Sequence, residues 1–317
     1  AVFPPGDDRN PDGESLASDP LVIQIPDRDE RIHVTVVWSE VARASGYRIY
    51  RSPDPDLAGG SELLIAEVPA SPRTYTDTGD AAGVQAPLPF GSLGAWAAMP
   101  SLITAREGAG VVAARDPADP SIAYLYALGG RDENGTALAS YEYLPVTLEA
   151  DGTHTVGNWV AGLEDLPVAR WQLGAFLADH AHADVVPVGD TWIYAGAGVA
   201  SNGTTTRSAV HAAQVQVGGD LGAWTNVTAM SPARAGYGYT LANSTLYAFG
   251  GLQAGASDGG ASSQITGPPN LGNWNNLGLS MTEARYLPGN VTESAFIFLL
   301  GGWNGTAATA SVEKTVW

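Results

Sequence analysis

Short apolar runs that stop at glycine recur along the chain. Each run is mostly apolar and closes on small residues, which is the pattern of a buried β-strand ending at a tight turn. The four runs are residues 125–130 (LYALGG), 192–198 (WIYAGAG), 246–251 (LYAFGG) and 297–302 (IFLLGG). Their recurrence predicts an all-β structure assembled from four copies of one unit.

Each glycine-ended run lies inside a longer repeated unit. An arginine precedes every run, a Gly-x-Trp step precedes every arginine, and a serine-led run follows the glycines, as at Ser140 and Ser208. The arginines are Arg106, Arg170, Arg234 and Arg285, and the tryptophans are Trp96, Trp159, Trp224 and Trp274. The tryptophans are 63, 65 and 50 residues apart, so the loops vary in length while the unit is kept.

These units resemble kelch repeats, whose period is about fifty residues and whose unit is a four-stranded blade of a β-propeller. The resemblance covers residues 91–317 and implies a four-bladed kelch-like β-propeller. The residues support this interpretation independently of the name. Paired glycines let backbones approach closely near a central axis, and a single blade cannot bury its faces unless neighbouring blades stack on it.

The fourth unit ends at Trp317 without its last strand, whereas residues 91–96 (GSLGAW) precede the first unit without a blade of their own. Pairing these two segments would close the ring and remove an exposed sheet edge. We expect this closure within one chain. The alternative is an incomplete ring that a neighbouring molecule finishes.

A second pattern precedes the propeller. Residues 32–38 alternate Val and Thr up to Trp38, and three further strand-like runs follow at residues 46–51, 63–69 and 74–79. Residues 21–90 therefore resemble a small fibronectin type III-like β-sandwich that lacks two strands. Such a module should pack on the propeller, receive strands from another molecule or be degenerate. The family implies a spacer or docking unit, not a catalytic site.

Residues 1–20 form an acidic N-terminal arm with three interpretations. Asp8, Asn10, Asp12 and Asp19 follow the spacing of a calcium loop, with Gly13 at the sharp turn. However, no helix-forming residues precede the loop, which favours a solvated acidic tail. If the arm is extended, it could instead add a strand to another subunit. The spacing thus implies calcium as a cofactor, and we expect the chain to associate with other copies of itself.

The balance of charge narrows the classes of partner. The formal net charge is −18 and the chain has no cysteine. Such a surface repels nucleic acid and anionic lipid, and no apolar run is long enough for membrane insertion. Without cysteine there are no disulfides, and the tyrosine–cysteine cofactor of galactose oxidase-like kelch propellers is excluded. The Ala1 start suits a chain already cleaved by a signal peptidase.

Six Asn-x-Thr sequons indicate where the protein resides. They are Asn134, Asn202, Asn226, Asn243, Asn290 and Asn304. Asn-Gly and Asn-Ser also make good turns, but that preference does not explain why the third residue of all six sequons is threonine. We therefore expect N-glycosylation at these asparagines and an extracellular or cell-surface location.

Candidate catalytic chemistry is sparse. His180 and His182, flanked by Asp179 and Asp184, could share a metal ion if they lay on a strand, although a surface turn fits the segment better. No nucleophile elbow or phosphate loop is present. The sequence thus predicts a non-enzymatic, glycosylated structural protein that self-assembles into a filament or sheath through its arm. The alternatives are an adhesion propeller that binds a carbohydrate or protein, or a glycan-active enzyme.

Overall fold

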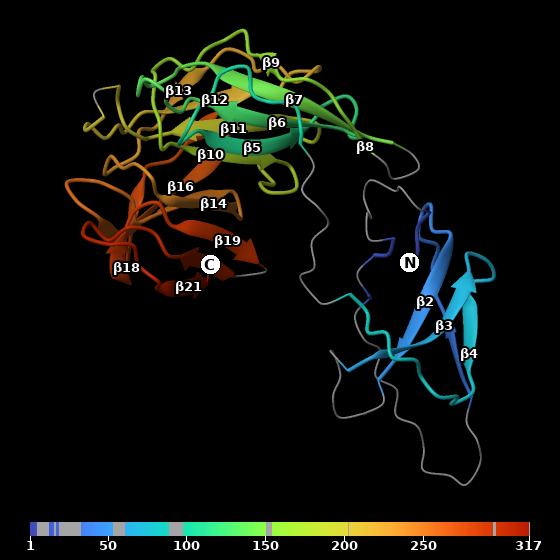
Figure 1. The fold of residues 1–317 in the computed structure, drawn as a ribbon. Coiled ribbons are helices and arrows are strands. Elements are labelled where there is room, and N and C mark those ends of the chain that lie inside the picture. Colours follow the sequence, from blue (N-terminus) through green and yellow to red (C-terminus); the bar gives the residue numbers. More distant parts are fainter. Residues whose placement is uncertain are drawn as a thin grey trace. The chain divides into compact units, whose positions relative to one another are not determined.

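Every regular element in the described part of the chain is a β-strand (Figure 1). The computed structural model describes residues 1–4, 13–15, 17–18, 33–52, 61–88, 98–149, 154–201, 203–293 and 296–316. Within these residues no helix is long and apolar enough to cross a membrane. The chain divides into two compact units, Ala1–Ala98 and Met99–Trp317. The boundary predicted after residue 90 falls among residues outside the described set.

The first unit contains two pairs of antiparallel strands. β1 (Val34–Val37) pairs with β4 (Thr74–Asp77), and β2 (Gly46–Arg51) pairs with β3 (Leu63–Pro69). All four strands lie where the alternating patterns predicted them. Trp38 packs edge-on against Tyr47 with ring centroids 5.2 Å apart, which places an aromatic contact next to the start of β2.

The second unit contains four antiparallel sheets in a four-bladed propeller-like arrangement (Figure 1). The strands of the first and second blades are β5 (Gly110–Arg115), β6 (Ile122–Leu128), β7 (Tyr141–Leu148), β8 (His154–Val156), β9 (Val160–Ala161), β10 (Gly174–Asp179), β11 (Thr191–Gly196), β12 (Val210–Gln214) and β13 (Thr225–Val227). In both blades the strands neighbour each other in chain order, except that β8 and β9 both pair with β7.

The third and fourth blades follow the same plan. Their strands are β14 (Gly238–Ala242), β15 (Thr245–Phe249), β16 (Ser257–Gly267), β17 (Asn270–Leu271), β18 (Asn275–Arg285), β19 (Gly289–Glu293), β20 (Phe296–Leu300) and β21 (Val312–Val316). β17 and β18 both pair with β16. The fourth blade has three strands within the described residues, and the predicted closing segment, residues 91–96, lies outside them.

The core of the second unit lies between blades. On β11, Ile193 joins an apolar cluster with Tyr126 of the first blade, whereas Tyr194 joins a cluster with Leu246 of the third. Successive residues of a strand point to opposite faces, so one strand supplies both interfaces. The Tyr126 hydroxyl crosses the first interface and donates to the carbonyl of Gly219 at 2.7 Å.

Paired glycines follow the second strand of the first, third and fourth blades because the backbone there is left-handed and crowded. In the second blade Ala197 takes the first of these positions, with φ +58°. Gly129 has φ +59° and Gly130 has φ +95°. A Cβ atom on Gly129 would lie 2.6 Å from the carbonyl oxygen of Arg170, and one on Gly130 would lie 2.9 Å from that of Glu107. Both distances are shorter than a carbon–oxygen contact allows, so the predicted close approach of backbones is confirmed.

The repeated arginines explain why glycine and arginine recur together. In each blade the guanidinium donates to the carbonyl at the glycine end of the second strand and to the carbonyl that leads into the third strand. The two acceptors are Gly129 and Ser140 for Arg106, Ala197 and Ala209 for Arg170, Gly250 and Gly259 for Arg234, and Gly301 and Ser311 for Arg285. All four side chains are buried.

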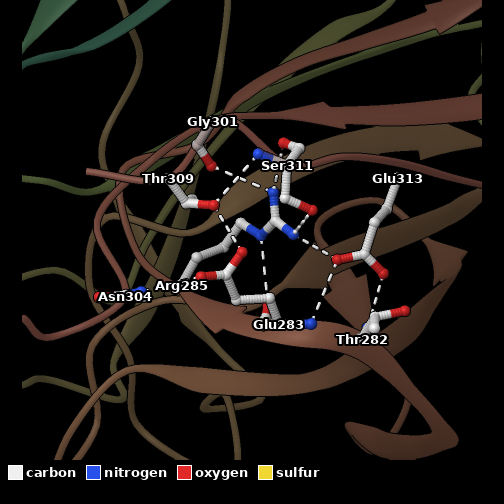
Figure 2. Close-up of polar contacts among 8 residues, drawn as sticks. All are labelled: Thr282, Glu283, Arg285, Gly301, Asn304, Thr309, Ser311 and Glu313. Atoms are coloured by element: carbon white, nitrogen blue, oxygen red, sulfur yellow. Dashed lines mark hydrogen bonds and ion pairs between the residues drawn. The ribbon is translucent and has the colours of Figure 1, made fainter. Parts of the chain in front are cut away.

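The residue two positions after the second acceptor, here called the partner position, differs from blade to blade. It is Glu142, His211, Ala261 and Glu313 in chain order. Glu142 pairs with Arg106 at 2.5 Å, Glu313 pairs with Arg285 (Figure 2), and His211 accepts from Arg170 at 3.1 Å through Nδ1. Ala261 offers no polar group, so the third blade has no such partner for its arginine.

A series of backbone hydrogen bonds joins one blade to the next. The N–H of Gln172 donates to Gly108 at 2.6 Å, that of Gly236 to Gln172 at 2.9 Å, and that of Leu287 to Gly236 at 2.6 Å. Each of these residues lies two positions after a buried arginine and has a positive φ. The repeated arginine therefore joins two strands within its own blade, and the residue two positions after it forms the link to the neighbouring blade.

Candidate functional site

The first residues of the chain lie on the free edge of β2. Val2 forms antiparallel bridges with Gly46 on one side and Glu14 on the other. Its N–H donates to the Gly46 carbonyl at 2.9 Å, and its carbonyl accepts from the Ser45 N–H at 2.8 Å. Residues 1–4 and 13–15 thus extend the β2–β3 sheet by two short segments, in the order Glu14, Val2, β2 and β3.

Side chains fix this chain-start hairpin, defined as residues 1–4 and 13–15, on the sheet. Phe3 is 7 % exposed and Glu14 is 8 % exposed. The Glu14 carboxylate forms an ion pair with Arg48 and accepts from the Tyr50 hydroxyl at 3.3 Å. A buried carboxylate needs such partners to offset its desolvation. The hairpin is therefore held by one buried aromatic ring and one buried ion pair.

The charged chain terminus is part of the same contact. The Ala1 ammonium donates to the Ser15 hydroxyl at 3.0 Å. Burial lowers the pKa of this ammonium below its usual value, although the nearby Glu14 carboxylate opposes the shift. Ala1 is thus bonded to the other segment of the hairpin, which a solvated tail would not show.

The sequence predicted that this module lacks two strands, without locating them, and the hairpin adds two short segments beside β2. Residues 1–3 and 13–15 are not part of a solvated tail, because they pair with β2 or with each other. The proposed calcium ligands Asp8, Asn10, Asp12 and Asp19 lie outside the described residues, so calcium binding there stays a prediction. The sequence had no local signal for this docking, because Val2 and Gly46 are far apart in the chain.

The sequon asparagines lie in three kinds of position. Asn134 and Asn304 follow the glycine end of a blade, and Asn243 is in the turn between β14 and β15 with φ +46°. Asn226 lies in β13. Asn290 lies in β19. Asn202 lies outside the described residues, and glycosylation at all six stays a prediction.

The two candidate metal-binding histidines do not converge. His180 and His182 lie in a turn after β10. The Nδ1 atom of His180 lies 2.9 Å from the carbonyl of Val186, whereas that of His182 lies 2.6 Å from the Asp179 carboxylate. Asp184 accepts from the Ser244 hydroxyl at 2.7 Å. Within the described residues, no three His, Asp or Glu side chains form a group that could hold a metal ion.

Two cavities open beside sequons. The first, of about 620 Å³, is lined by residues 105–107 and 131–135, which include Asn134. Two of its acidic groups are already engaged, since Glu107 pairs with Arg131 and Asp132 accepts from the N–H groups of Asn134 and Thr136. The second cavity, of about 380 Å³, is lined by the His180 turn together with Asn243, Ser244 and Gln264.

The guanidinium of Arg131 stacks over the Trp171 ring at 3.9 Å, next to the first cavity. Trp303 occupies the position in the fourth blade that Arg131 occupies in the first, and it is 40 % exposed. Aromatic groups therefore lie at the glycine ends of blades. No protein-family model matches this chain, and no curated protein matches it.

Proposed function

We propose that this chain is a secreted or cell-surface glycosylated structural protein that self-assembles by exchanging its chain-start hairpin between copies. The proposal rests on the observation that residues 1–4 and 13–15 complete the edge of β2. A long connection separates these residues from β1. Residues 16–32 form that connection and could span about 55 Å if extended. We propose further that the first unit is fibronectin-like, that the propeller is kelch-like and that the protein has no catalytic activity.

Exchange conserves the contacts of the hairpin. A hairpin from a second copy would form the same bonds to Gly46, the same Glu14–Arg48 ion pair and the same Phe3 contact. The free energies of the two arrangements then differ mainly by the entropy of association, so a high local concentration favours exchange. If each copy donates to the next, the interface is head-to-tail and produces an open filament.

A charge-reversal pair tests the exchange. Glu14→Arg places two arginines at the docking site, and Arg48→Glu places two carboxylates there. Each variant alone should fail to assemble, because like charges meet in a partly buried contact. In a mixture, the arm of one variant is complementary to the edge of the other. We expect filaments in the mixture and none in either preparation alone, as seen by electron microscopy.

The double variant Glu14→Arg/Arg48→Glu is the matched control, because it restores opposite charges within one chain. Glu67, the other partner of Arg48, is 57 % exposed, so its repulsion with a new carboxylate is weak. Assembly of the double variant without rescue in the mixture would show that the hairpin docks only on its own chain. That result would contradict the proposed exchange.

A second candidate is an adhesion propeller that binds a carbohydrate or a protein. The exposed Trp303 and the Arg131–Trp171 stack favour it, because aromatic rings provide flat contact surfaces for sugars. In that case Trp303→Ala should abolish binding to a glycan array and leave assembly unchanged. Binding that survives this substitution would contradict this second function.

A further inference from the structure

The five described sequon asparagines differ in what their side-chain amides already bind. Nδ2 of Asn290 donates to the Tyr239 carbonyl at 2.8 Å, and its Oδ1 accepts from the Tyr239 N–H at 3.3 Å. This asparagine is a bridge between β19 and β14, the innermost strands of two blades. An amide nitrogen used in this way is not free to be modified without breaking the bridge.

Asn304 is engaged more completely. Its Nδ2 donates to the Glu283 carboxylate at 2.8 Å, next to the buried Arg285 network (Figure 2). Its Oδ1 accepts from the N–H groups of Thr306 and Ala307 at 3.0 and 2.9 Å. Hydrogen bonds from Thr309 and Asn304 lower the pKa of Glu283 below its usual value. Asn226 lies opposite His211 in the β12–β13 pairing, and its amide is not assigned to either group.

Asn134 and Asn243 form the other group. Both are exposed, and the structure gives their side-chain amides no hydrogen bond within the described residues. Their backbones are nevertheless fixed, since the Asn134 N–H donates to Asp132 at 3.0 Å and the Asn243 carbonyl accepts from the Thr245 hydroxyl at 3.2 Å. Each also lines one of the two cavities, so there is open space next to its amide.

The chemistry of N-glycosylation requires a free amide nitrogen. The nitrogen forms a bond to the anomeric carbon of an activated sugar, the bond from that carbon to the phosphate leaving group of the donor breaks, and the amide loses one proton. The donor is thus a lipid-linked sugar phosphate supplied by the host. An amide already donating within a folded blade must first give up that bond, and a sugar must then fit in its place.

We infer that Asn134 and Asn243 carry N-linked glycans, whereas Asn290 and Asn304 stay unmodified and stabilise the blades. This inference rests on the proposed glycosylated, extracellular function and adds the sites at which the glycans attach. The first sugar of each glycan would lie at the mouth of a polar cavity. Glycans would then project from the first and third blades.

Glycopeptide mass spectrometry of the natural protein tests the assignment. We expect glycan mass on the peptides that contain Asn134 and Asn243 and none at Asn290 and Asn304. Glycans at Asn290 or Asn304 would overturn the assignment but not the glycosylated function. The same holds if Asn134 and Asn243 are bare in a glycosylated chain. A natural chain without any glycan would overturn both the assignment and the glycosylated function.

A stability series on unglycosylated recombinant full chain gives a separate readout. The isosteric substitutions Asn290→Asp and Asn304→Asp remove a donor and place a charge beside an acceptor, so the unfolding temperature should fall by several degrees. Asn134→Asp and Asn243→Asp are the matched controls, because aspartate also tolerates a left-handed backbone, and they should shift it little. Equal shifts at all four positions would contradict the division into structural and acceptor asparagines.

Discussion

The partner position decides how each blade compensates its buried arginine. Glu142 and Glu313 supply a carboxylate, which also accepts from two backbone N–H groups in each blade. For Glu313, burial opposes ionisation, but those N–H groups and the Arg285 charge outweigh it and lower the pKa. The second blade uses His211 instead, which must stay neutral to accept from Arg170.

Because of that requirement, the stability of the protein should depend on pH through His211. Burial and the Arg170 charge lower the pKa of His211 to about 4. The unfolded histidine takes up a proton near pH 6.5 and the folded one only near pH 4, so stability falls as the pH falls through this window. The loss should reach about 2 kcal/mol near pH 4, with solvent screening included. Urea unfolding at several pH values measures it.

His211→Gln is the control for this prediction. Glutamine keeps an acceptor for Arg170 but does not titrate. The free energies of unfolding of the two proteins should differ by a constant amount above pH 7 and diverge between pH 6.5 and 4. Curves that stay parallel down to pH 4 would show that His211 has no role in the acid response, which would then come from the carboxylates.

At the scale of elements, the glycine ends of the second strands are the most constrained positions of each blade. Gly130 and Gly135 both have a positive φ, but a Cβ atom would clash only at Gly130. Gly135→Ala should cost about 1 kcal/mol from the left-handed backbone alone. Gly130→Ala should cost clearly more, since backbone atoms of two segments must separate. Thermal unfolding of both variants compares the costs, and equal losses would refute the packing argument.

The strands could be predicted because their signals are local. The runs before Gly129 and Gly250 are short and apolar, and both form the second strand of a blade. The partners of the repeated arginines could not be predicted in this way. Arg106 and Glu142 are far apart in the sequence and come together only in the folded blade. No residue next to either one indicates its partner.

The same limit applies to the candidate sites. The sequon motif identifies Asn290 and Asn134 equally, because it contains no information about which amide a neighbouring blade engages. The docking of Val2 on Gly46 could not be predicted from the sequence either, because an apolar residue near its beginning has many equally good interpretations. The prediction of two missing strands implied unpaired edges but did not indicate which edge the docking would use.

At the scale of the whole molecule, the formal net charge of −18 opposes association of identical copies. Salt should therefore promote assembly, because the Debye length shortens from about 30 Å at 0.01 M to about 3 Å at 1 M. Light scattering against NaCl concentration should show growing assembly. The non-assembling Glu14→Arg variant is the control and should stay flat, and assembly that weakens with salt would contradict the expectation.

The pairing of Val2 with Gly46 also has a mechanical consequence. Hydrogen bonds of an antiparallel pair run across the strand direction, so tension along the strands loads all of them together in shear. Peeling from one end would load them one at a time. In the proposed filament, these contacts would therefore resist tension applied along the strands better than peeling from one end.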